Sequence, residues 1–218
     1  MDLQSAVMVK WDCQGNLRDE DWAKEKGNEG KEFPSLAVRS AKKCFEILKA
    51  VPQKMIQKET LLWLKGLYEK AKNYDSDDDW NIRNYATICV WCGEMKEAIT
   101  LYKSLLIHMG EKYYLWAELA DMLPNNNDLR IGLLLKAKSL EQNEDFLGEI
   151  HLSLASLWQK EGHGSLANDE LQAYARHREE KGWNLSGRFH EIQANTTSCV
   201  DSSTDIDLNS YINKAEDY

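Results

Sequence analysis

Two cysteines separated by two residues, in Cys89-Val90-Trp91-Cys92, are the first candidates for chemistry in this sequence. Redox-active dithiols with this spacing belong to strand–helix–strand folds, and zinc sites with this spacing need a second ligand pair. The sequence contains neither pattern. Because Cys89 falls on the apolar face of a predicted helix, we interpret it as a packing residue.

An acidic run, Asp75-Ser76-Asp77-Asp78-Asp79, has the alternating carboxylates of a calcium-binding loop. Such a loop needs glycine at its sixth position and glutamate at its twelfth. Those positions hold Trp80 and Ala86. We therefore interpret the run as negative charge placed before a helix N-terminus, where the helix dipole favours it.

The five histidines show no metal-ligand spacing, and the sequence has no glycine-rich phosphate loop after a strand and no G-x-S-x-G motif. His151 falls where a large packing residue is expected, so we interpret it as structural. We expect no catalytic residues, no metal and no cofactor, and predict that the protein is not an enzyme.

The composition indicates what class of protein carries these candidate residues. The chain has 218 residues, 43% of them hydrophobic and 29% charged, enough for one globular domain with tails. Its net charge of −9 argues against a surface that coats nucleic acid or anionic membrane as a whole. Five irregularly spaced cysteines and the lack of an 18-residue apolar stretch favour a cytoplasmic protein without membrane contact.

The first third of the chain contains an N-terminal polar segment and a predicted helical region. We expect residues 1–33 to be mostly loop. Pro34 and Ser35 begin a helix predicted over 35–50, and Pro52 ends that helix and opens a second one to about residue 73. Residues 34–74 are then either a divergent helical pair of a repeat array or its N-terminal cap.

A repeat begins at residue 79 and is the strongest signal in the sequence. Ala86, Ala120 and Ala155 lie 34 and 35 residues apart, and a second small residue follows each by 12 positions. Between the two small residues stand Gly93, Asn127 and Gly162, which accept the left-handed conformation that ends a helix. Each unit is predicted to be two helices that approach closely at the small residues.

These spacings resemble the tetratricopeptide repeat (TPR), and the resemblance covers residues 79–183 as about three units. It implies an all-α fold, a TPR-like α-solenoid of antiparallel helix pairs. The second unit departs from the family pattern, because Pro124 shortens its first helix and Lys136 replaces a large apolar residue. Residues 184–218 are expected to be a linker and C-terminal tail, with a short packing segment at 183–192 and one or two amphipathic turns at 207–218 as the alternatives.

The resemblance also implies a concave groove lined by the first helix of each unit. Transferred to this sequence, the groove positions are Trp80, Arg83, Asn84, Thr87, Trp91, Tyr114, Ala117, Glu118, Asp121, Glu149, Leu152, Ser153 and Ser156. Its acidic residues exclude the carboxylate clamp of some family members and predict a basic or neutral partner segment. Trp80 and Trp91 are either groove anchors or packing residues against the upstream helix.

The function predicted first is a non-enzymatic scaffold for protein–protein interaction. The alternative is a nucleic-acid-associated accessory factor, using a basic patch in the helices of 35–73. This patch comprises Arg39, Lys42, Lys43, Lys49, Lys54 and Lys58. The chain also resembles TPR-like proteins of bacterial defence loci at Phe33-Pro34-Ser35 and Lys181-Gly182-Trp183, which implies action beside a nucleic-acid enzyme. A third hypothesis is a self-associating structural subunit.

Overall fold

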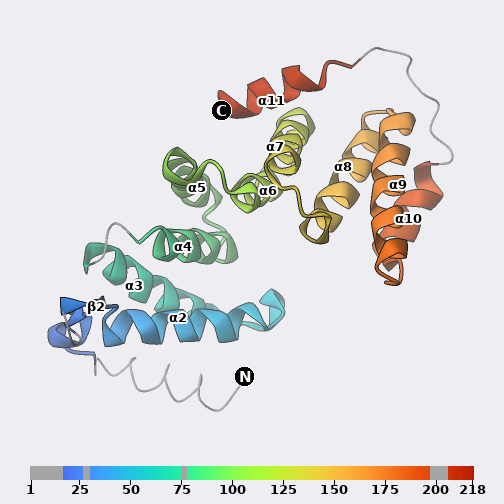
Figure 1. The fold of residues 1–218 in the computed structure, drawn as a ribbon. Helices are drawn as coiled ribbons and strands as arrows, with labels where there is room; N and C mark the ends of the chain where they lie inside the picture. Colours follow the sequence, from blue (N-terminus) through green and yellow to red (C-terminus); the bar gives the residue numbers. More distant parts are fainter. Residues whose placement is uncertain (1–16, 27–29, 75–77, 197–205) are drawn as a thin grey trace. The chain divides into compact units, whose positions relative to one another are not determined.

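The computed structural model describes residues 17–26, 30–74, 78–196 and 206–218, and most of them are helical (Figure 1). The predicted all-α class is confirmed. The chain divides into two compact units, Met1–Leu105 and Leu106–Tyr218. Asp75 and Asp77 of the acidic run lie outside the described residues. Asp78 caps the following helix, because its side chain accepts hydrogen bonds from the backbone N–H groups of Trp80 and Asn81.

The first unit is a set of helices preceded by a small ribbon. Its elements are η1 (Asp19–Trp22), β1 (Glu25–Lys26), β2 (Glu32–Phe33), α2 (Leu36–Lys49), η3 (Gln53–Met55), α3 (Lys58–Tyr74), α4 (Asp79–Trp91) and the start of α5 (Met95–Met109). Helix α3 packs against both α2 and α4. The buried side chains of α2 and α3 follow the helical period, which places their apolar faces together.

The described residues before α2 contain the short elements η1, β1 and β2, where the sequence predicted mostly loop. The two strands pair antiparallel, and Trp22 is only 2% exposed. The Trp22 ring stacks on Tyr74 with centroids 5.7 Å apart. The second long helix begins at Lys58 rather than at Pro52, because Pro52 and Ile56 have extended backbone and leave only the short η3 between them.

The predicted left-handed helix ends at Gly93 and Gly162 are confirmed. Both glycines have positive φ angles, 81° and 80°, a backbone conformation that residues with a side chain rarely adopt. The carbonyls of Cys89 and Trp158 each accept a hydrogen bond from the residue just after the glycine. Asn127 differs from the expectation: it is the first residue of a helix, and Asn126 caps that helix by accepting from the Leu129 N–H.

The second unit consists of helices packed in sequence. Its elements are α6 (Tyr113–Asp121), α7 (Asn127–Leu140), η4 (Glu144–Phe146), α8 (Gly148–Lys160), α9 (Gly164–Glu180), α10 (Gly187–Thr196) and α11 (Leu208–Glu216). Helix α6 packs against α7, α7 against α8, and α8 against α9. The repeat alanines Ala120, Ala155 and Ala167 are fully buried, as their predicted role at close helix contacts requires.

The expectation of a linker and tail at 184–218 is corrected by two packed helices. Helix α10 packs against α8 and α9, and its Phe189 and Ile192 join a buried cluster with Leu152, Leu171 and Tyr174. Helix α11 packs against α7 (Figure 1). Among the described residues, no helix is both long and apolar enough to cross a bilayer.

Candidate functional site

A pocket of about 740 Å³ opens in the first unit, where η3 and the start of α3 meet the end of α4. Its apolar wall is formed by Ile56, Leu61, Leu62 and Trp91, and Leu62 is 50% exposed. The pocket volume falls within the range of ligand-binding clefts in proteins. The arrangement is an apolar hollow that a side chain from another molecule can enter.

Two predicted sets of residues meet at this pocket. Lys54 and Lys58 of the basic patch are exposed and line it, and Trp91 of the predicted groove forms part of its wall. The Gln53 side-chain amide donates a hydrogen bond to the Trp91 carbonyl, which holds η3 against the end of α4. The sequence did not predict this meeting, because it depends on the break in the helix after Pro52.

Trp91 is held in place by an aromatic contact with α2. Its ring stacks on Phe45 with centroids 5.3 Å apart and an interplanar angle of 16°. Trp91 therefore packs against α2, while its side chain also lines the pocket beside η3 and α3, and its role as a groove anchor stays a prediction. Trp80 is 50% exposed, with the Arg83 guanidinium 5.5 Å from its ring centroid.

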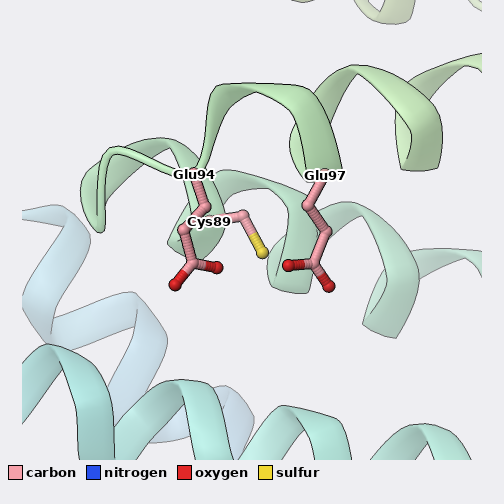
Figure 2. Close-up of side chains that lie close together, drawn as sticks. All are labelled: Cys89, Glu94 and Glu97. Atoms are coloured by element: carbon pink, nitrogen blue, oxygen red, sulfur yellow. The ribbon is translucent and has the colours of Figure 1, made fainter.

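A cluster of one thiol and two carboxylates adjoins the pocket, and one of its carboxylates, Glu94, lines it. The possible ligand atoms of Cys89, Glu94 and Glu97 all lie within 4.8 Å of one another, and Figure 2 shows the Cys89 sulfur between the two carboxylates. The Lys65 ammonium lies 2.7 Å from Glu94 and 3.8 Å from Glu97. A cation from the protein itself thus already balances the charge that a metal ion would balance.

The protonation of this cluster disfavours nucleophilic chemistry at the thiol. Burial, helped by the charge of Glu97, raises the pKa of the Cys89 thiol to about 12, so the thiol stays protonated at neutral pH. The Tyr85 hydroxyl donates to Glu97, and its own pKa is raised by burial and by this hydrogen bond. Electrophiles react with thiolates, so the protonated Cys89 thiol is a poor nucleophile.

The remaining groove residues of the first repeat unit pack mainly within the protein. The Asn84 side-chain amide donates to the Tyr68 hydroxyl of α3, and the Thr87 hydroxyl donates to the Arg83 carbonyl. Of this set, Trp80 and Trp91 offer aromatic surface.

Two groove positions of the second structural unit, Glu149 and Ser153, contact α10, although Glu149 itself stays exposed. The Arg188 guanidinium forms an ion pair with Glu149 and donates a hydrogen bond to the Ser153 hydroxyl. Burial raises the pKa of Asp121, although Arg130 and Arg188 oppose that shift. Tyr114 and Glu118 are half-buried on α6. The sequence missed this arrangement because it predicted at most a short packing segment where α10 lies.

Four of the six residues of the basic patch form ion pairs or line the pocket. Arg39 pairs with Glu25, and the Lys42 ammonium lies 2.9 Å from the Asp78 carboxylate. Lys43 and Lys49 are exposed on α2. The six residues therefore do not act as a single cationic surface.

A second polar cluster, which the sequence did not single out, joins three helices of the second unit. His151 is 2% exposed, and its Nδ1 lies 2.6 Å from the Glu170 carboxylate. Lys138 donates to both oxygens of Glu170, at 2.8 and 2.9 Å. The Nε2 of His151 lies 3.1 Å from Glu144 of η4. Each ring nitrogen of His151 thus faces a carboxylate, which supports its predicted structural role.

A family described as a domain of unknown function (DUF7017) matches residues 79–211, more than half of the chain. The chain belongs to this family. The DUF7017 region contains the repeat, the Cys89 cluster and the His151 network. No curated protein matches the chain.

The boundaries of the DUF7017 region divide the candidate sites. Trp91 and Cys92 lie inside it, whereas η3 and the first turns of α3, which carry Lys54 and Lys58, lie before it. The region ends at Tyr211, inside α11. One wall of the pocket is therefore contributed by the family domain and the other by the preceding helices.

Proposed function

We propose that this protein is a non-enzymatic, TPR-like helical-repeat scaffold that binds a segment of another protein, with its main contact at the pocket of the first unit. The observation that carries the proposal is an open apolar hollow with Trp91 in its wall and two lysines lining it. Aromatic side chains beside such hollows are typical of binding hot spots. The buried repeat alanines and the glycine reversals support the repeat interpretation.

The chemistry of the pocket indicates the kind of segment. An apolar side chain fits against Leu61, Leu62 and Trp91, because burying apolar surface drives association. Lys54 and Lys58 favour an acidic residue beside that apolar anchor. The expectation of a basic or neutral partner rested on Glu118, Asp121 and Glu149. We instead place the binding at the pocket, where apolar side chains and two lysines lie together, and propose an apolar anchor flanked by an acid.

A random-peptide display selection on the immobilised full chain tests this proposal. We expect the enriched peptides to share an aromatic or aliphatic residue next to aspartate or glutamate. A peptide made from the consensus is then labelled, and its binding is measured by fluorescence anisotropy. The double variant Lys54→Glu/Lys58→Glu should weaken binding about tenfold, which corresponds to about 1.4 kcal/mol.

The matched control is Lys43→Glu/Lys49→Glu, which makes the same charge change on exposed residues of α2 away from the pocket. Leu62→Glu adds a charge to the apolar wall and should abolish binding. Equal affinity for wild type and the Lys54/Lys58 variant, or equal loss in both charge variants, would contradict binding at the pocket.

Nucleic acid is the second candidate partner, and the exposure of Lys43, Lys49, Lys54 and Lys58 is the observation that favours it. The same variants separate the two functions. Binding of a labelled oligonucleotide should be weakened by both charge variants and should fall steeply with salt. Leu62→Glu should weaken peptide binding far more than oligonucleotide binding. A cytoplasmic location, with a role in bacterial defence, belongs to this second candidate.

A further inference from the structure

Helix α11 lies against α7 at a position where only glycine fits. A Cβ atom built on Gly132 would lie 2.1 Å from the Tyr211 carbonyl oxygen and 3.1 Å from the Ala215 Cβ. Contacts under about 3 Å between such atoms force a displacement, so the α7 surface forms a slot that admits the α11 backbone. The repeat predicted that Gly132 serves the pairing of α6 with α7, whereas its closest contacts are with α11.

Side chains on both sides of this slot recognise α11. The Tyr211 ring meets the edge of Trp158 from α8, with centroids 5.5 Å apart. The Lys136 ammonium lies 2.6 Å from Glu216, and Lys214 lies 3.6 Å from Asp128. The surface therefore favours a helix that carries an aromatic residue, a small residue four positions later and an acidic residue directly after the small one. The ion pair with Glu216 explains why lysine stands at position 136, where the repeat pattern has a large apolar residue.

The docked helix is small and mostly solvent-exposed. It has nine residues, and of these only Ala215 is buried. A helix of this length is marginal by itself in water, so the α7 surface must hold it in helical form. The preceding segment, residues 197–205, is rich in serine, threonine and aspartate, a composition typical of linkers. A short tether raises the local concentration of a weak ligand to the millimolar range.

We propose that the surface of α7 around Gly132 is a second protein-binding site, which α11 occupies as a tethered pseudo-ligand. Its partner is a helix with an aromatic residue, alanine or glycine four positions later and an acidic residue next. Such a helix competes with α11 for the slot. This site lies in the second unit and is independent of the pocket of the first.

The full-length chain, with a protease recognition sequence inserted within residues 197–205, provides the test. After cleavage, a labelled synthetic peptide of residues 206–218 is added, and its binding is followed by fluorescence anisotropy. We expect the peptide to exchange with the released fragment and to bind the cleaved chain at least tenfold more tightly than the uncleaved chain, because cleavage removes the advantage of the tether.

Two variant peptides test the slot itself. Ala215→Arg places a long side chain against Gly132 and should weaken binding at least tenfold. Asn213→Arg introduces the same side chain at an exposed position of α11 and should bind within twofold of wild type. The proposal is overturned if a hundredfold excess of peptide does not displace the cleaved fragment, since α11 is then a permanent part of the fold. It is also overturned if the two arginine peptides bind equally well.

Discussion

Replacing Glu170 with glutamine removes one negative charge from the buried network that joins α7, α8 and α9. Glu170 is 7% exposed, and it accepts hydrogen bonds from Lys138 while facing the buried His151 ring at 2.6 Å. Removing one partner of a buried ion pair costs about 3–5 kcal/mol, since the other charge is left uncompensated. The Lys138 side chain is 34% exposed and can be rehydrated, which favours the lower end of that range. We expect a loss of about 3 kcal/mol at pH 7.

Urea unfolding followed by circular dichroism and tryptophan fluorescence measures this loss. The control is Asp169→Asn, an exposed neighbour on the same helix, which should change the free energy of unfolding by less than about 0.5 kcal/mol. A loss below about 1 kcal/mol in Glu170→Gln would refute the assignment of a stabilising ion-pair network.

The pH dependence gives the experiment a second, independent readout. Burial by itself raises the pKa of Glu170, but the hydrogen bonds and charges of His151 and Lys138 outweigh it, so the pKa is lowered overall. A carboxyl group whose pKa is lower in the folded state stabilises the protein above its unfolded pKa, about 4.3 for glutamate. The difference between wild type and Glu170→Gln should therefore be complete at pH 7 and shrink as the pH falls through the folded pKa. A difference that grows in acid would contradict this sign.

Four further predictions rest on the contacts described. Gly66→Ala should raise the free energy of unfolding by about 0.5–1 kcal/mol, because the added Cβ on α3 meets no atom within 4 Å. Gly132→Ala should increase the hydrogen exchange of α11 residues 208–216, because its added Cβ collides with the Tyr211 carbonyl. Phe45→Ala removes the ring on which Trp91 stacks and should cost about 3–5 kcal/mol, with a shift of tryptophan emission in the folded state. Cys89 should be alkylated by iodoacetamide at pH 8 far more slowly in the folded than in the urea-unfolded chain, because its raised pKa keeps the thiolate scarce. Peptide mass spectrometry measures the extent of alkylation.

Local patterns predicted most of the helices and their ends. The helix at Leu36–Lys49, the reversals at Gly93 and Gly162, and the early end of α6 before Pro124 follow from backbone preferences of single residues. The helices α10 and α11 were underestimated as a short packing segment and one or two amphipathic turns, since their polar sequences carry few apolar residues and their helical form depends on the surfaces beneath them.

By itself, the sequence determined the helical class, the 34-residue periodicity and the glycine reversals, because each depends on residues near one another in the chain. Only the tertiary structure decided which side chains meet. The pocket joins Lys54 to Trp91, Arg188 reaches Glu149, and Gly132 of α7 receives α11. These contacts link residues 37 to 83 positions apart, and such pairings are set by how whole helices pack rather than by any local preference.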